Sequence, residues 1–301
     1  ASLYEYTPYI GNSSKTGCGT LGQKMFWDLM KRYFSGGSSE SSAGGGSSSS
    51  GSSSSTGSSP ISWQTRAQIG RGWPARVVHP GDWTGNGYAD LMLIRPNGDL
   101  MLYVGGPGEK FSMPTRIGRG WETISWVEGG VDWDGDGKND LLAEVKSTGE
   151  LRLYRGDGRG GFSGTLAVSP GLPSAKLLTL ARTPEGVGLY GVEGDRLVLY
   201  SPTPAGKIGQ RKEFGRGWSV MTALVAVGDW TQDGVPDLLA RDAQGRLFLY
   251  PGRPGNSFGA AVRVGTGWGS MSPIGVSDQY RKQSPLWPVQ TDGKLWSYKV
   301  L

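Results

Sequence analysis

Alternating apolar and polar positions run through the chain from Pro60 to Leu301 and predict short β-strands. One strand pattern, Leu-x-Leu-Tyr, recurs at regular distances, and its tyrosines follow one another at intervals of 51, 46, 50 and 48 residues. The five copies are Leu100–Tyr103, Leu151–Tyr154, Leu197–Tyr200, Leu247–Tyr250 and a variant at Leu295–Tyr298. Such a period is typical of propellers, in which one four-stranded blade cannot bury both faces without neighbours. We therefore predict an all-β fold, a five-bladed β-propeller over residues 60–301.

The fourth copy shows how one blade divides into strands. Its predicted inner, second, third and outer strands are Leu224–Trp230, Asp237–Arg241, Arg246–Tyr250 and Phe258–Val264. The chain stops just after the third strand of the fifth copy, which leaves that blade one strand short. An unassigned strand pattern over Ile61–Ile69 precedes the first copy. We expect this segment to complete the fifth blade, because a closed ring leaves no exposed strand edges.

Clustered carboxylates separate the first and second strands of the second blade. The stretch VDWDGDGKNDLL carries Asp132, Asp134, Asp136 and Asp140. Oxygen ligands at alternate positions, with Gly135 and Gly137 allowing a tight turn, suit a hard cation such as Ca²⁺. The alternative is a turn in which Asp side chains accept hydrogen bonds from backbone N–H groups.

Composition limits the classes of partner. The 301 residues include 52 Gly and 12 Trp, and the formal net charge is +5. No apolar run approaches the roughly 18 residues of a membrane helix, so we predict no membrane span. Without a basic stripe, we predict no nucleic-acid partner.

The counts of cysteine and histidine restrict the chemistry. Cys18 is the only Cys and His79 the only His, so an internal disulfide and a His-rich zinc site are excluded. A Ser–His–Asp triad could form only around His79, and no nucleophile–base pair emerges from the motifs. We therefore predict that the protein is not an enzyme. The chain begins Ala-Ser-Leu, as a processed exported protein or a trimmed chain would.

Residues 1–34 are predicted to form a docking arm, with an extended segment followed by a short helix over Thr20–Phe34. A helix of about 15 residues is marginal alone in water, so it should dock on its own downstream domain or on a partner protein, unless the segment is disordered or an artefact of expression; we predict a partner protein. The partner-binding residues would be Tyr4, Tyr6, Tyr9, Leu21, Met25, Phe26, Leu29, Met30 and Tyr33. Residues 35–59, almost pure Gly and Ser, predict a disordered flexible linker, natural or engineered.

Four predicted junctions between blades carry Gly-x-Gly-Trp. In an up-and-down blade these junctions lie on the face opposite to the acidic turns. A Trp ring suits the C–H face of a sugar, and Arg donates hydrogen bonds to sugar substituents. The candidate ligand-binding residues are Trp73, Trp121, Trp218 and Trp268 with Arg71, Arg119 and Arg216. The alternative is that each Trp packs between blades as core.

The order of these motifs resembles the FG-GAP/VCBS repeats of secreted bacterial proteins. The shared frame is Gly-Asp-Trp-x-x-x-Gly-x-x-Asp-Leu, then Gly-x-Leu-x-Leu-Tyr, then Gly-x-Gly-Trp, over Pro60–Leu301. The resemblance implies structural Ca²⁺ in the acidic turns and a secreted, lectin-like module, although most such propellers have seven blades. It implies as ligands Asp132, Asp134, Asp136, the Lys138 carbonyl and Asp140 in the second blade, and Asp229, Thr231, Asp233, the Val235 carbonyl and Asp237 in the fourth.

Together these observations favour a secreted, non-catalytic module that binds glycan on a cell surface or cell wall and is tethered to a larger assembly by its arm. The layout is similar to the lectin-bearing component of actinobacterial umbrella toxin particles. The alternative function is a structural or protein-binding adhesion propeller without sugar binding.

Overall fold

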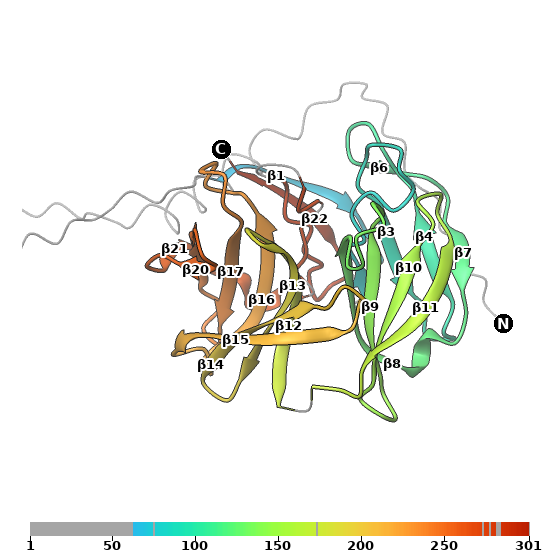
Figure 1. Ribbon diagram of the computed structural model, residues 1–301. Coiled ribbons are helices and arrows are strands. Elements are labelled where there is room, and N and C mark those ends of the chain that lie inside the picture. Colours follow the sequence, from blue (N-terminus) through green and yellow to red (C-terminus); the bar gives the residue numbers. More distant parts are fainter. Residues whose placement is uncertain are drawn as a thin grey trace, which may run out of the picture. The chain divides into compact units, whose positions relative to one another are not determined.

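The computed structural model describes residues 63–74, 76–172, 174–272, 274–276, 278–280 and 284–300. By its internal contacts the chain divides into Ala1–Ser55 and Thr56–Leu301, and the described residues all belong to the second unit. This unit is a five-bladed β-propeller (Figure 1). Helical structure within the described residues is limited to two 3-10 turns, η1 (Trp121–Thr123) and η2 (Trp268–Ser270).

Each of the first four blades is an antiparallel sheet with its strands in chain order from the inner to the outer edge. Blade 1 is β2 (Val77–Val78), β3 (Leu91–Ile94), β4 (Leu100–Tyr103) and β7 (Thr115–Gly118), and blade 2 is β8 (Ile124–Val131), β9 (Asp140–Val145), β10 (Leu151–Gly156) and β11 (Phe162–Ser169). Blade 3 is β12 (Ala175–Thr183), β13 (Gly186–Glu193), β14 (Arg196–Pro202) and β15 (Ile208–Arg216), and blade 4 is β16 (Met221–Gly228), β17 (Asp237–Asp242), β18 (Leu247–Tyr250) and β21 (Val262–Gly265).

The outer strand predicted for the fourth blade differs from the observed one. Instead of one strand over Phe258–Val264, the chain forms β20 (Ser257–Phe258) and then β21. The reason is a small hairpin in which β20 pairs with β19 (Gly252–Arg253). Blade 1 has the same device, a hairpin of β5 (Gly105–Gly106) and β6 (Lys110–Phe111).

The fifth blade is completed by the two ends of the propeller. β1 (Trp63–Gly70) pairs antiparallel with β22 (Leu295–Val300), from Trp63 opposite Val300 to Gly70 opposite Leu295 (Figure 1). The two inner strands of this blade are reduced to isolated bridges, including Met271 to Gln290 and Leu286 to Tyr298. The segment near the start of the propeller is therefore the outer strand of the last blade.

The hydrophobic core consists of five separate clusters, each between two neighbouring blades. The cluster between blades 1 and 2 contains Trp83, Leu102, Trp121 and Leu141, for example. Burial between blades rather than within them explains why a single blade is not a stable unit. The Trp that directly follows the first Asp of each acidic motif is among the most buried side chains, with Trp83, Trp133 and Trp230 at most 2% exposed.

Candidate functional site

The Gly-x-Gly-Trp motif forms the corner between two blades. At the Gly118–Trp121 corner, glycine is needed at the two positions for different reasons. A Cβ on Gly118 would lie 2.5 Å from the indole Nε1 of Trp121, so the first glycine makes room for the ring. The second, Gly120, has φ 81° and precedes η1, a conformation that favours glycine. The Trp121 N–H then donates to the Gly98 carbonyl at 3.0 Å, in the turn between the second and third strands of the preceding blade.

The motif also brings the two recurring aromatic residues together. Each junction Trp packs on the Tyr of a Leu-x-Leu-Tyr strand, with ring centroids 4.6–4.8 Å apart. The pairs are Trp73–Tyr103, Trp121–Tyr154, Trp218–Tyr250 and Trp268–Tyr298. The four indoles are only 5–9% exposed. A ring this buried offers no face to a sugar, so the expectation of direct stacking is replaced by the packing alternative.

The three predicted arginines lie on the surface. Arg71, Arg119 and Arg216 are exposed, each at a different junction. The corners are separated by whole blades, so the structure does not gather these arginines into one site.

A cavity of about 490 Å³ lies at the centre of the ring, on the side of the junctions. Its walls are residues at the start of the inner segments of all five blades, from Val77 in blade 1 to Ile274 in blade 5, together with residues near the ends of second strands such as Glu144 and Arg241. The exposed residues Ser125, Lys176 and Thr222 mark its mouth.

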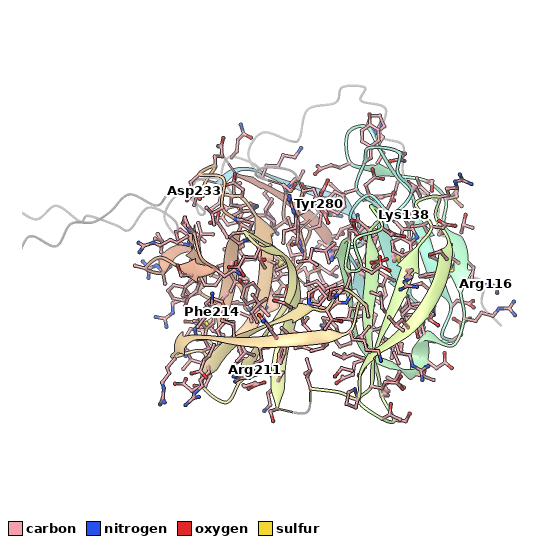
Figure 2. All side chains as sticks on the ribbon, viewed as in Figure 1. Arg116, Lys138, Arg211, Phe214, Asp233 and Tyr280 are labelled. Carbon is pink, nitrogen blue, oxygen red and sulfur yellow. The ribbon has the colours of Figure 1, made fainter. Side chains whose placement is uncertain are left out.

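The opposite end of the central channel is crossed by Gln279 and Tyr280 of the fifth blade. Gln279 Nε2 donates to the Leu180 carbonyl at 2.8 Å, and the Asp132 N–H donates to the Tyr280 hydroxyl at 2.9 Å. These bonds join the fifth blade to blades 3 and 2, which are not its neighbours in the ring. Figure 2 shows Tyr280 on the same side of the view as Lys138 and Asp233, which come from two of the acidic turns.

Trp126 is the aromatic wall of the cavity. It is partly exposed in β8, unlike the junction tryptophans, and lines the cavity beside Ser125 and Glu144. The Ser125 hydroxyl donates to Glu144 Oε2 at 2.5 Å. An apolar ring next to a fixed polar pair is the usual composition of a small-ligand site.

Two arginines of the cavity bridge neighbouring blades. Arg76 Nη2 donates to the Ile124 carbonyl at 2.7 Å, and Arg241 Nη1 donates to the Trp268 carbonyl at 3.1 Å. Carbonyl acceptors fix a guanidinium without removing its charge. Both cations are therefore held in place at the cavity wall.

The start of β12 carries a bulge where it borders the cavity. The pairing with β13 shifts between Lys176 and Thr179, and Leu177 has φ 51°. A positive φ is costly for a bulky side chain, and residues held in such conformations cluster at functional sites and in tight turns. The irregular backbone presents Lys176 to solvent at the mouth.

Two ionisable groups lie deeper in the cavity. Glu128 accepts hydrogen bonds from the Thr179 hydroxyl and the Leu180 N–H, both at 2.9 Å. Burial raises the pKa of Glu128 to about 8, so it is largely protonated at neutral pH. His79 Nε2 lies 2.9 Å from the Trp287 carbonyl, and burial lowers the pKa of His79 to about 4, which leaves its ring neutral.

None of these cavity residues was among the predicted site residues. Trp126, Arg76 and Arg241 do not recur from blade to blade, whereas the predicted glycan-binding and metal-binding residues all belong to recurring motifs. Part of the cavity lining could have been found from the sequence, because the first residues of every predicted inner strand must face the axis of a closed ring.

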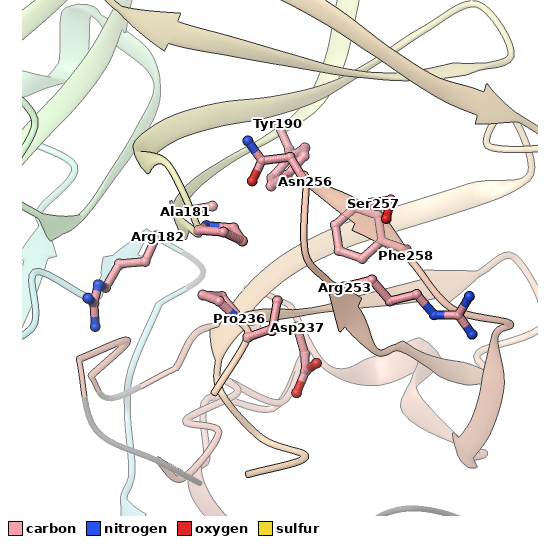
Figure 3. A pocket seen from close by; sticks show the side chains of 11 residues that line it. Ala181, Arg182, Tyr190, Pro236, Asp237, Arg253, Asn256, Ser257 and Phe258 are labelled. Carbon is pink, nitrogen blue, oxygen red and sulfur yellow. The ribbon is translucent and has the colours of Figure 1, made fainter. Parts of the chain in front are cut away.

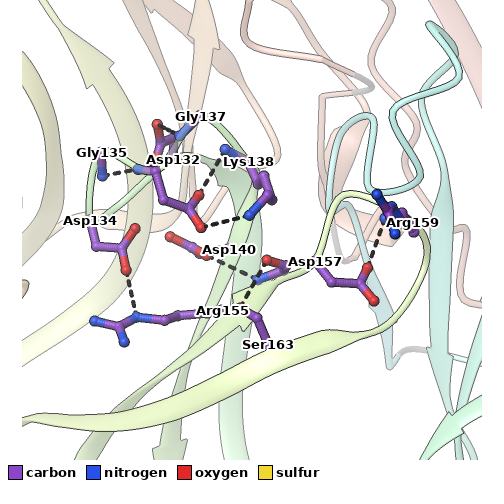
Figure 4. Close-up of polar contacts among 12 residues, drawn as sticks. Asp132, Asp134, Gly135, Gly137, Lys138, Asp140, Arg155, Asp157, Arg159 and Ser163 are labelled. Carbon is purple, nitrogen blue, oxygen red and sulfur yellow. Dashed lines mark hydrogen bonds and ion pairs between the residues drawn. The ribbon is translucent and has the colours of Figure 1, made fainter.

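The acidic turn of blade 2 brings three of its predicted ligands together (Figure 4). One carboxylate oxygen from each of Asp132, Asp134 and Asp136 lies within 4.8 Å of the others. Asp132 accepts from the N–H groups of Gly135 and Gly137, both at 2.8 Å. Asp134 Oδ2 is 2.5 Å from Arg155 Nε, while its buried Oδ1 has no hydrogen-bond partner.

The last Asp of each acidic motif has a structural role. Asp140 accepts from the N–H groups of Trp133 at 2.9 Å and Gly156 at 3.1 Å, and burial raises its pKa to about 7. Asp237 accepts from Trp230 at 2.8 Å and Gly252 at 2.7 Å. Asp90 does the same in blade 1, between Trp83 and Gly105. Each of these carboxylates ties the acidic turn to the turn between the third and fourth strands.

The remaining predicted ligands of blades 2 and 4 sit in the same turns. The Lys138 N–H donates to Asp136 Oδ1 at 2.9 Å, and the Val235 N–H donates to Asp233 Oδ1 at 2.9 Å. Thr231 donates through its N–H to Asp237 at 2.8 Å, and Asp229 accepts from the Gly234 N–H at 3.1 Å. The bonds to Asp136 and Asp233 are those of Asx turns, and the bonds to Asp237 and Asp229 span six and five residues across the loop.

A second, much smaller hollow lies between blades 3 and 4, lined by Tyr190, Asn256 and Phe258 (Figure 3). Its volume of about 10 Å³ is no more than one water molecule needs.

The predicted arm and linker lie outside the described residues. This applies to every predicted partner-binding residue, Tyr4, Tyr6, Tyr9, Leu21, Met25, Phe26, Leu29, Met30 and Tyr33. Within the part of the chain that the structure describes, no helix has the length and apolarity needed to cross a membrane.

Comparison with known proteins adds little to the geometry. No family model matches the chain, and no curated protein matches it. The FG-GAP/VCBS resemblance therefore stays a prediction.

Several solved structures have a similar fold at low identity. A lectin of Agrocybe aegerita specific for non-reducing terminal N-acetylglucosamine is 16% identical with a TM-score of 0.44, over 71% of this chain and 61% of that chain. AofleA of Arthrobotrys oligospora is 14% identical with a TM-score of 0.43, over 64% and 56%. A luciferin-regenerating enzyme is 11% identical with a TM-score of 0.40, over 71% and 74%. The chain thus spans less than two thirds of the length of the first two.

Proposed function

We propose that the propeller is a non-catalytic module that binds carbohydrate in the central cavity on the junction face. The observation that carries this proposal is the partly exposed Trp126, set beside the Ser125–Glu144 pair in a cavity of about 490 Å³. The ring supplies an apolar surface for a sugar face, and the polar groups supply hydrogen bonds to hydroxyls. A volume of this size is in the range of small-ligand sites.

The cavity favours binding over catalysis. Its carboxylates, Glu128 and Glu144, are both held in hydrogen bonds within the wall. Their hydroxyl partners are Ser125 and Thr179, and the neutral His79 is bonded to a backbone carbonyl rather than to either hydroxyl. These bonds fix the shape of a binding site.

A glycan array tests the proposal. We expect the intact chain to bind a subset of saccharides and Trp126→Ala to weaken that binding by about tenfold or more, as for a buried aromatic anchor. The matched control is Tyr88→Ala, since Tyr88 is 41% exposed in the acidic turn of blade 1. Equal binding by both variants would contradict the proposed site. An array without any signal would favour the adhesion propeller instead.

We also propose that the acidic turn of blade 2 holds a structural Ca²⁺ ion. The three clustered carboxylates and the unpartnered Oδ1 of Asp134 support a cation at this position. The ion would offset the repulsion between these carboxylates and brace the loop. Blade 4 is proposed as a second, weaker site, with Asp229 and Asp233 as its carboxylates.

Thermal unfolding with Ca²⁺ tests this site. Binding at 100 times the dissociation constant stabilises the folded state by about 2.7 kcal/mol, so we expect the midpoint to rise by about 5 °C or more. EDTA should reverse the rise, and Asp134→Asn should remove it. Asp292→Asn, in an exposed turn of the fifth blade, should leave it intact. No response of the intact chain to Ca²⁺ would refute the metal site.

The wider setting is proposed from the sequence. We propose that the module is secreted, that residues 1–34 tether it to a partner protein, and that it delivers a larger assembly such as a toxin complex to a glycan. A pull-down from the native secretome with Ala1–Phe34 as bait should recover that partner. Recovery of none would indicate docking of the arm on its own chain.

A further inference from the structure

The charges around the central cavity are unequal. Its ionisable lining residues are Arg76, Lys176, Arg241, His79, Glu128 and Glu144. We infer that the cavity selects a saccharide carrying negative charges, as carboxylate or phosphate groups, over a neutral one. This selectivity rests on the proposed function of the cavity as a carbohydrate site.

The positive charges are not neutralised within the described residues. Arg76 and Arg241 donate to backbone carbonyls, and none of Arg76, Arg241 and Lys176 forms an ion pair in the described part of the chain. The three cations come from blades 1, 4 and 3, so they surround the cavity. A concave site lined by one sign of charge concentrates ligands of the opposite sign.

Fewer negative charges are present at neutral pH than the number of acidic residues in the cavity indicates. Glu144 accepts the Ser125 hydroxyl at 2.5 Å. Glu128 lies deeper, and burial raises its pKa to about 8. His79 is neutral because burial lowers its pKa to about 4. At pH 7 three cations therefore face a single carboxylate.

This balance has a pH signature. The groups that contact Glu128 are Thr179 and Leu180 of β12, and the other charged groups of the cavity are Arg76, Lys176, Arg241 and Glu144. Above pH 8 Glu128 ionises and adds a second negative charge, so binding of a charged saccharide should weaken between pH 6.5 and 9. Glu128→Gln stays neutral and should not show this loss.

Isothermal titration of the full chain at pH 7 and low salt tests the inference. The probes are tetragalacturonic acid, mannose 6-phosphate, and the neutral chitotetraose. We expect one charged probe to bind about tenfold or more tightly than chitotetraose, and to weaken as salt is raised. The two charged probes distinguish a carboxylate ligand from a phosphate ligand.

Two lysine reversals supply the matched control. Lys176→Glu should weaken binding of the charged probe by about tenfold, whereas Lys110→Glu, exposed in β6 far from the lining, should change it by less than about twofold. Equal effects of Lys176→Glu and Lys110→Glu, with chitotetraose bound as tightly as the charged probes, would overturn the charge selection. If Trp126→Ala still weakened binding by about tenfold or more, the carbohydrate site itself would be supported. Binding of no probe, or binding unaffected by Trp126→Ala, would overturn both.

Discussion

At the scale of single residues, the recurring motifs are explained by packing. In three of the four Gly-x-Gly-Trp copies the first Gly lies under the indole, and in all four the second Gly has a positive φ and the Trp packs on a Tyr of a Leu-x-Leu-Tyr strand. A residue can therefore recur in four blades without touching a ligand. The residues that line the cavity differ from blade to blade, as a site for one ligand requires.

The first prediction separates packing from surface roles. Trp121→Ala should lower the free energy of unfolding by about 3–5 kcal/mol, because it empties a buried aromatic position. Arg119→Ala, two residues away and exposed, should change it by no more than about 0.5 kcal/mol. Urea titrations of the two variants provide the measurement. Equal and small effects would mean that the ring is not core.

The second prediction concerns pH and Glu128. The pKa of Glu128 is raised from 4.5 to about 8 in the folded chain, so between these values the folded state keeps a proton that the unfolded state loses. The free energy of unfolding should then fall as pH rises, by up to about 1.4 kcal/mol per pH unit for one proton. Glu128→Gln cannot ionise and should escape this loss.

Urea titrations at pH 5, 6, 7, 8 and 9 measure the difference between the two proteins. The stability of Glu128→Gln relative to the unmodified chain should grow up to pH 8 and then level off. The raised pKa of Asp140 affects both proteins alike and cancels in this comparison. A difference independent of pH would show that Glu128 is ionised in the fold.

At the scale of elements, the ring is closed by more than the β1–β22 pairing. Glu109, in the hairpin of blade 1, reaches the fifth blade. Its Oε1 accepts from the Trp287 indole at 3.1 Å and the Ser297 hydroxyl at 2.8 Å, and its Oε2 lies 3.3 Å from Lys299 Nζ. Glu109 has φ 57°, a conformation that this set of bonds holds in place.

The third prediction is that Glu109→Ala loosens the closure. It leaves the buried Trp287 and Ser297 donors without a partner and should cost about 2 kcal/mol or more. The control is Glu185→Ala, in an exposed turn of blade 3, which should be nearly neutral. Urea titration reports the stability, and proteolysis within β1 reports whether the outer strand is released. Equal stability of the two variants would contradict a role for Glu109 in closure.

At the scale of the whole molecule, the period of 46–51 residues was sufficient to predict five blades because each blade contains a copy of the Leu-x-Leu-Tyr strand. The missing strand of the fifth blade indicated which segment completes it. The cavity could not be predicted in the same way. Trp126, Lys176 and Arg241 are far apart in sequence and share no motif, so only the closed ring brings them together. The Glu109 contacts depend on a positive φ at Glu109, which no local sequence pattern predicted.

The proposed metal site and the proposed ligand site lie on opposite faces of the propeller. Acidic turns and the Gln279–Tyr280 crossing lie at one end of the channel, and the junctions and the cavity lie at the other. A proposed structural cation and a proposed ligand are thereby kept apart, so each can be removed without the other. Loss of Ca²⁺ should lower stability without abolishing saccharide binding at temperatures where the chain stays folded.

Hydrogen–deuterium exchange, with and without the saccharide that gives the strongest array signal, tests the central claim most directly. We predict slower exchange at the first residues of the inner strands, in β8, β12 and β16, and no change in the acidic turns of blades 1 and 2. Protection confined to the acidic turns or outer strands, or no protection by any saccharide, would contradict a carbohydrate site in the central cavity.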